Sequence, residues 1–308
     1  MPLLPCTASL GASSDVNRDS DMPAPAEHTL SHWLHPRQML SHLRDIDSEA
    51  SRERQQCSDE TLWLRAWTVI AVACLCLLMV HYLKYSNNLR EFIPLLESLF
   101  GIENSQWKMA WLRSPYRDLI GNVWWGCWQL IGFMLIPMLT IRFILKQRLR
   151  DYGWQAGSVK EHWLGYVLLA TPIMVFAVIA SFGDDFSNHY PFYKLANRSW
   201  SDLLMWEAIY ILQFVAVEFF FRGFLVNGLR LQFGSLSVAI MCLPYLMLHF
   251  PKLWPESFGA ILFGFFLGIL AVRSKSIWGG VAVHVSIALT MDIAALLQTK
   301  GLPQHWGF

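Results

Sequence analysis

Long uninterrupted runs of hydrophobic residues make up most of the chain. Seven of them approach the roughly 20 residues that an α-helix needs to cross the hydrocarbon core of a bilayer. They cover residues 63–83, 119–141, 163–182, 203–229, 235–250, 258–272 and 277–297. The fifth and sixth runs are short, and Pro244 and Pro251 are expected to kink or end the fifth. The pattern predicts an all-α, polytopic membrane helix bundle with about seven transmembrane helices, within a range of six to eight.

The first sixty residues follow a different pattern. They mix Ser, Asp, Pro and Glu, and they lack the basic start and apolar core of a secretory signal. We therefore expect residues 1–60 to form a polar, mobile cytoplasmic tail. Residues 61–308 are expected to form the transmembrane helical domain.

Composition supports a membrane protein and argues against a nucleic-acid partner. Hydrophobic residues make up 54% of the chain and charged residues 15%, whereas soluble domains carry about 25% charge. The net charge of +1 provides no broad basic surface for phosphate backbones. The six cysteines form no CxxC pair, so neither a zinc ribbon nor a disulfide framework is indicated.

Basic residues predict the orientation in the membrane. Five of them lie between the second and third runs, at positions 142–160. Because positively charged flanks tend to stay on the cytoplasmic side, this loop and the N-terminus are expected in the cytoplasm. The same count of spans places the C-terminus outside.

Two charged residues interrupt the fourth apolar run. Glu218 and Arg222 lie among aromatic and aliphatic residues, where a lone charge would cost several kcal/mol. A spacing of four residues places them on one face of an α-helix, where they can form an ion pair. Arg222 could simply neutralise a structural Glu218, but buried charge pairs are rarely retained for stability alone.

Three further polar residues fall at similar predicted depth. His249 ends the fifth run, His284 lies near the start of the seventh, and Asp292 follows two helical turns later. With a rise of about 1.5 Å per residue, Glu218, His249 and His284 could meet inside the bilayer. One histidine in an apolar run is usually a packing residue. Two histidines and a glutamate that converge from three helices indicate a functional site instead.

A carboxylate and two imidazoles allow two kinds of chemistry. Glu and His can together remove a proton from water and direct the water at a carbonyl, which would hydrolyse a peptide bond within the membrane. Glu218, His249 and His284 could instead bind a divalent metal such as zinc with an open coordination position. In that case Asp292 would be the nearby candidate for the general base. Both alternatives stay open at this point.

These residues resemble the motifs of the CPBP family, the intramembrane proteases related to CAAX prenyl endopeptidases and to bacteriocin-processing or immunity (Abi) proteins. The family has Glu-Glu-x-x-x-Arg on one helix, Phe-x-x-x-His on the next, and His-x-x-x-Asn or Asp near the C-terminus. The matching residues are Glu218 and Arg222 for the first motif, Tyr245 and His249 for the second, and His284 for the third. The resemblance covers about a third of the chain and defines a core at residues 199–297.

Two positions depart from the family pattern. Val217 stands where the family has its first glutamate, which is usually assigned to activating water, and Ala288 stands where it has Asn or Asp. A valine cannot accept a proton, so Glu218 would have to take over. Alanine removes a group that could stabilise an oxyanion, a loss worth roughly 3–4 kcal/mol in a comparable site. Asp292, one turn further along, is the candidate substitute.

The resemblance implies an intramembrane endopeptidase that acts on a membrane-tethered or lipid-modified protein near its terminus. In this hypothesis Glu218 and His249 activate water, and His284 polarises the scissile carbonyl. Arg222 orients Glu218, while Tyr245 and Asp292 provide support. The lipid bilayer is then the second partner.

Two other classes of function were weighed against hydrolysis. Val217 and Ala288 favour a catalytically inactive relative that acts as an immunity, binding or chaperone factor. A transporter could use the same buried Glu, Arg and His as an ion path, but the chain shows no convincing duplicated halves.

Overall fold

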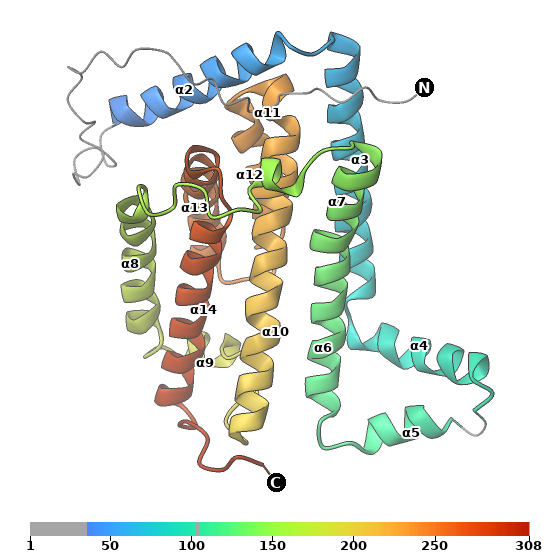
Figure 1. Cartoon of the computed structure of the whole chain (residues 1–308). Helices are drawn as coiled ribbons and strands as arrows, with labels where there is room; N and C mark the ends of the chain where they lie inside the picture. The colour runs from blue at the N-terminus through green and yellow to red at the C-terminus, as the bar shows by residue number, and fades with distance from the viewer. Residues whose placement is uncertain (1–35, 103–104, 308) are drawn as a thin grey trace. The chain divides into compact units, whose positions relative to one another are not determined.

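The computed structural model describes residues 36–102 and 105–307, which are helical or irregular and contain no strand (Figure 1). The helices are α2 (Pro36–Arg54), α3 (Asp59–Leu83), α4 (Ser86–Leu99), α5 (Gln106–Arg113), α6 (Arg117–Leu130), α7 (Ile136–Leu139), α8 (Trp163–Ala180), α9 (Asp184–His189), α10 (Trp200–Glu218), α11 (Gly228–Phe233), α12 (Leu236–Met247), α13 (Trp254–Ser274) and α14 (Trp278–Gln298). Three π-helical segments, η1 (Ile131–Leu135), η2 (Thr140–Ile144) and η4 (Phe219–Asn227), and a 3-10 turn, η3 (Leu149–Tyr152), continue or link them.

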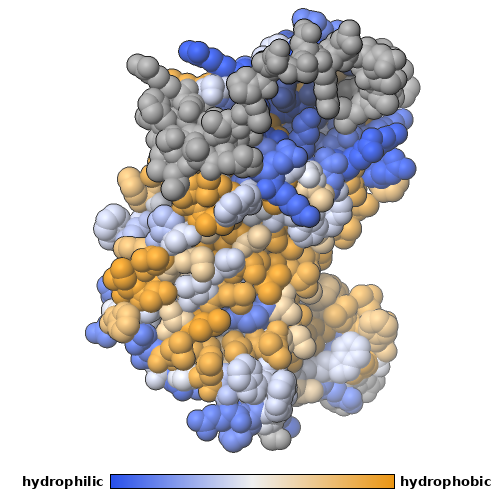
Figure 2. Space-filling model, turned by 60° about the vertical axis from the view of Figure 1, so that its left-hand side comes forward, coloured by the Kyte–Doolittle hydropathy of each residue, from blue (hydrophilic) through white to orange (hydrophobic). Residues whose placement is uncertain are grey.

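Six helices in the described part of the chain are long and apolar enough to cross a bilayer. They span Asp59–Leu83, Arg117–Ile144, Trp163–Ala180, Trp200–Phe233, Trp254–Ser274 and Trp278–Gln298. The predicted polytopic helical bundle is therefore confirmed. The fifth apolar run forms the shorter helix α12, whereas the sixth is longer than its apolar core suggested. Hydrophobic side chains cover much of the surface visible in Figure 2, as expected for helices in contact with lipid.

The helices form two compact units. Unit 1 comprises the described residues up to Val72 together with residues 138–169 and 219–280, and unit 2 comprises the remaining described residues. In unit 1, α12 and α13 pack closely because α13 presents glycines to α12. A Cβ atom at Gly264 would lie 2.9 Å from the ring of Tyr245, and one at Gly268 would lie 2.7 Å from Val238. Small residues allow such close approach between membrane helices.

Helix α2 also belongs to unit 1, although it lies within the segment 1–60. It packs against α11 and α13, and Ile46 and Ala50 on its inner face are buried. Glu53 accepts two hydrogen bonds from Arg230, at 2.8 and 2.9 Å. Residues 36–54 of the expected tail are thus helical and held to the unit by apolar contacts and an ion pair.

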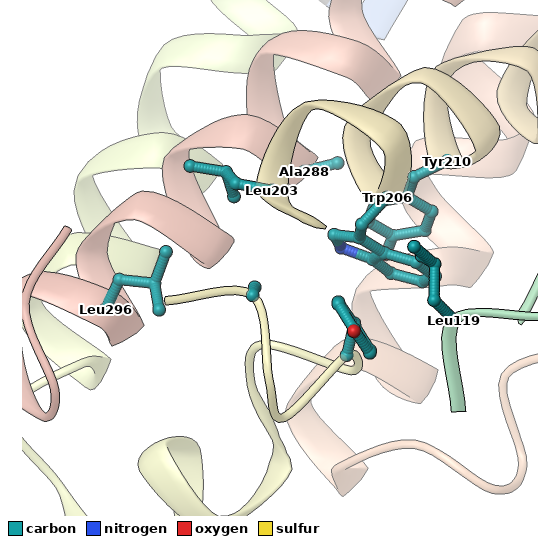
Figure 3. Packing of buried hydrophobic residues seen from close by; sticks show 8 residues of the cluster. Leu119, Leu203, Trp206, Tyr210, Ala288 and Leu296 are labelled. Carbon is teal, nitrogen blue, oxygen red and sulfur yellow. The ribbon is translucent and has the colours of Figure 1, made fainter. Parts of the chain in front are cut away.

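Unit 2 is built around the helices that carry part of the predicted site. A hydrophobic cluster joins α6, the segment before α10, α10 and α14. Figure 3 shows the cluster and labels Leu119, Leu203, Trp206, Tyr210, Ala288 and Leu296. Gly126 of α6 brings this helix close to α10, since a Cβ atom there would lie 2.5 Å from the side chain of Ile209.

Candidate active site

Glu218 and His284 lie in direct contact inside unit 2. Glu218 is the last residue of α10, and His284 lies near the start of α14. Nδ1 of the imidazole is 2.8 Å from Oε1 of the carboxylate. Glu218 is fully buried and His284 is 9% exposed. Two of the predicted site residues therefore meet in a region where few charged groups occur.

Phe214 supports the imidazole from one side. Its ring stacks on His284, with centroids 5.2 Å apart and an angle of 13° between the planes. Phe214 precedes Glu218 by four residues on α10, so both side chains lie on the same face of the helix. One face of α10 thus supplies both the ring that supports the imidazole and the carboxylate that it meets.

This arrangement determines which nitrogen of His284 can react. A carboxylate accepts hydrogen bonds, so the proton of the neutral imidazole is expected on Nδ1, which faces Glu218. Nε2 then carries the lone pair that can accept a proton or bind an electrophile. A carboxylate behind a histidine is a common way of setting its tautomer and orientation.

Arg222, Tyr245 and His249 form a second group, inside unit 1. The guanidinium of Arg222 lies over the ring of Tyr245, 4.2 Å from its centroid. The rings of Tyr245 and His249 are 4.7 Å apart, and Nδ1 of His249 donates a hydrogen bond of 2.9 Å to the carbonyl of Tyr245. Ser257 in turn donates to the carbonyl of His249 at 2.6 Å. Tyr245 is thus the residue that the other two share.

The helix changes its winding between the two groups. α10 ends at Glu218, and the next nine residues, including Arg222, form the π-helix η4. The regular α-helical spacing assumed for a Glu218–Arg222 ion pair does not continue through this segment. Short π-helical segments within α-helices are frequent at functional sites.

The predicted site residues are therefore divided between the two units. Glu218 and His284 come together in one, and Arg222, Tyr245 and His249 come together in the other. A single pocket that contains all five stays a prediction.

Asp292 and Ala288 lie further along α14. Oδ2 of Asp292 accepts a hydrogen bond of 2.7 Å from the indole of Trp206. Asp292 is eight residues from His284, about 12 Å along a helix axis, and its hydrogen bond connects α14 to α10. Ala288 is buried in the hydrophobic cluster with Trp206 and Tyr210. The position at which the family carries Asn or Asp is thus surrounded by apolar side chains.

The zinc alternative needs Glu218, His249 and His284 as ligands. Within residues 36–102 and 105–307, no group of three or more His, Cys, Asp or Glu side chains that could hold a metal ion is found. Glu218 and His284 provide two candidate ligands in unit 2, whereas a catalytic zinc takes three from the protein. His249 lies in unit 1, so a zinc site made of all three residues stays a prediction.

Sequence reasoning missed Phe214 and Trp206 as partners of the polar residues. Their only signal was position, since Phe214 lies one turn before Glu218. Glu207 lies 11 residues before Glu218 on α10, which is about 16 Å along the helix axis. It is buried on α10, and neither of its carboxylate oxygens has a hydrogen-bond partner among the described residues.

Comparison with known proteins supports the motif analysis. Residues 199–290 match the model of the Rce1-like family, described as type II CAAX prenyl endopeptidase Rce1-like. The predicted family resemblance is confirmed. The matched segment contains Glu218, Arg222, Tyr245, His249 and His284. Neither the comparison with curated proteins nor that with solved structures gave a match.

Proposed function

We propose that this protein is an Rce1-like intramembrane endopeptidase that cleaves a peptide bond near the terminus of a membrane-tethered or lipid-modified protein. The observation that carries the proposal is the buried contact between Glu218 and His284. The family match to residues 199–290 supports the same reaction class. The six helices that are long and apolar enough to cross a bilayer support a reaction within the membrane.

The geometry supports a carboxylate–histidine pair that acts on water. Nε2 of His284 takes a proton from a water molecule, and the water oxygen attacks the scissile carbonyl carbon. Glu218 holds Nδ1 and balances the charge of the imidazolium. When the C–N bond breaks, the imidazolium returns its proton to the amine that leaves. This assignment gives His284 the proton transfer that the sequence analysis assigned to Glu218 and His249.

His249 and Arg222 keep supporting roles in the proposal. The hydrogen bond from Nδ1 of His249 to the Tyr245 carbonyl leaves Nε2 of a neutral imidazole as an acceptor. Tyr245 holds the charge of Arg222 at a defined position through its ring. In this proposal both residues contact the substrate or the attacking water, and their role is not limited to orienting Glu218.

Cleavage by purified protein tests the proposal directly. The protein in liposomes is given a prenylated peptide with a fluorescence reporter that responds to loss of the terminal residues. We expect Glu218→Gln and His284→Ala to lower kcat by about 10²-fold or more, the usual contribution of acid–base catalysis. Glu60→Gln is the matched control, because it makes the same change at an exposed position on α3. Unchanged cleavage in both site variants would contradict the proposal.

A catalytically inactive scaffold is the second candidate function. It is favoured by Val217 at the position of the family's first glutamate and by the apolar surroundings of Ala288. It predicts that the same variants impair folding or partner binding while the wild-type protein forms no hydrolysis product. Any product whose formation depends on Glu218 and His284 would exclude this candidate.

We further propose that the N-terminus faces the cytoplasm, because basic residues gather in the segment 142–160. An epitope tag at the N-terminus of the full chain should resist external protease in right-side-out vesicles. Digestion of the tag without permeabilisation would reverse the orientation.

A further inference from the structure

Helices α4 and α5 form a hairpin between two membrane-spanning helices. Residues 84–85 connect the end of α3 to α4, and residues 114–116 connect α5 to α6. Links this short hold the hairpin at the end of both spans. In Figure 1, α4 and α5 run crosswise to α6 at its N-terminal end.

The inner side of the hairpin is well ordered by its own contacts. Leu89 and Ile93 of α4 pack with Trp111 of α5 in a small buried cluster. The buried carboxylate of Glu97 accepts hydrogen bonds from the backbone N–H groups of Trp107 and Lys108, at 2.6 and 3.1 Å. A carboxylate at the first turn of a helix satisfies free N–H groups and complements the helix dipole. The two helices are therefore joined at the turn as well as along their length.

The outer side of the hairpin presents large apolar side chains. Phe92, Leu95 and Leu99 follow one another at spacings of three and four on α4 and are 38%, 53% and 72% exposed. Phe100 and Trp107 extend this surface at the turn, with ring centroids 5.8 Å apart. We call Phe92, Leu95, Leu99, Phe100 and Trp107 the apolar face of the hairpin.

A separate side of α4 is polar. Asn87 and Arg90 are exposed and lie three residues apart, whereas Leu95 and Leu99 on the apolar face lie four residues apart. Successive helical residues are rotated by about 100°, which places the middle of the polar pair about 130° around the helix axis from the middle of the apolar pair. The helix thus has an apolar exposed side, a polar exposed side and a buried side.

We propose that the α4–α5 hairpin lies in the lipid–water interface, with its apolar face in contact with the acyl chains of the bilayer. The hairpin is connected by short links to α3 and α6, which are both long and apolar enough to cross the membrane. The hairpin therefore lies close to the surface of the bilayer. Trp side chains such as that of Trp107 are enriched at this depth of a membrane. Amphipathic helices that lie in the interface bury one apolar side and leave the polar side in water.

Lipid photocrosslinking tests the proposal on the full-length protein. The photoreactive residue p-benzoylphenylalanine replaces Leu95 or Leu99 on the apolar face, and Asn87 or Arg90 on the polar side as matched controls. The protein is irradiated in vesicles of phosphatidylcholine and phosphatidylglycerol, and adducts are detected by mass spectrometry. We expect several-fold more phospholipid adduct from positions 95 and 99 than from positions 87 and 90.

Two results would overturn the proposal. Equal lipid adducts at all four positions would show that the hairpin has no preferred side toward the bilayer. Crosslinks from positions 95 and 99 to a second copy of the chain would show that protein covers the face. Since none of the four positions belongs to the candidate active site, cleavage activity serves as a check that each variant is folded.

Discussion

The imidazole of His284 and the carboxylate of Glu218 are 2.8 Å apart and buried between α14 and α10. Each side chain alone would be an isolated polar group in a membrane-spanning helix, where such groups are costly and usually functional. Together they form a polar pair in surroundings that are otherwise mostly apolar. This contact determines both the proposed chemistry and the expected response of the protein to mutation.

Removal of both Glu218 and His284 should cost less stability than the sum of the two single removals. His284→Ala leaves the buried Glu218 carboxylate without its imidazole, which is expected to cost about 3–5 kcal/mol. The double variant Glu218→Leu/His284→Leu should cost clearly less than the sum of the single variants. Unfolding free energies measured in mixed micelles form the double-mutant cycle. Additivity within about 0.5 kcal/mol would mean that the two side chains do not interact.

Substitution of Phe214 should affect catalysis more than substrate binding. Phe214→Leu removes the ring that stacks on His284, and such aromatic pairs contribute about 0.5–1.5 kcal/mol. We expect a lower kcat with little change in KM, because the imidazole is held less firmly. Phe214→Tyr keeps the ring and should retain near wild-type kcat. If both variants have the same kcat, the stacking has no positioning role.

The ring of Tyr245, rather than its hydroxyl, should matter for stability. A desolvated cation–π contact such as that with Arg222 is worth about 2 kcal/mol. Tyr245→Leu should therefore lower the unfolding free energy by about this amount or more, whereas Tyr245→Phe should cost much less. Denaturant unfolding of the two variants provides the comparison. Equal losses would assign the contribution to the hydroxyl instead.

The hydrogen bond between Trp206 and Asp292 should stabilise the packing of α10 on α14. Trp206→Phe leaves a buried carboxylate oxygen without its donor, at an expected cost of about 1.5–3 kcal/mol for a bond to a charged group. Asp292→Asn retains an acceptor oxygen and should be milder than Asp292→Leu. Thermal unfolding in bilayer discs gives this order directly. The reverse order would show that the hydrogen bond from Trp206 does not stabilise this packing.

Tyr193 should make stability depend on pH in the alkaline range. It lies between α9 and α10, outside the spanning helices, and its hydroxyl donates a 2.6 Å hydrogen bond to Asp202. Burial, followed by the hydrogen bond to Asp202, raises the pKa of Tyr193. The folded state thus keeps the phenol proton more tightly than the unfolded state does. Stability is fully present below the unfolded pKa of about 10 and falls as the pH rises above it.

Tyr193→Phe provides the control for this pH dependence. The variant has no phenol proton to lose, so its stability should fall less between neutral and strongly alkaline pH than that of the wild type. Unfolding free energies of both proteins over this range check the prediction. Parallel pH profiles would show that another group is responsible.

The sequence alone determined the helical membrane architecture and named the polar residues of the candidate site. Hydropathy is a sum over consecutive residues, so apolar runs identify spanning helices without knowledge of their neighbours. The order of the three motifs likewise identified Glu218, His249 and His284, and the family match includes all of them. Phe214 could not be identified from the sequence. Within an apolar run, a phenylalanine that packs on a site residue has the same sequence neighbours as one that faces lipid.

Only the tertiary structure decided which of these residues meet. His284 approaches Glu218 from α14, and the chain changes from α-helix to π-helix directly after Glu218. Contacts of this kind depend on the rotation of each helix about its axis and on close packing at residues such as Gly126. Those are properties of neighbours far apart in the chain, and a local pattern of hydrophobic and polar residues does not contain them.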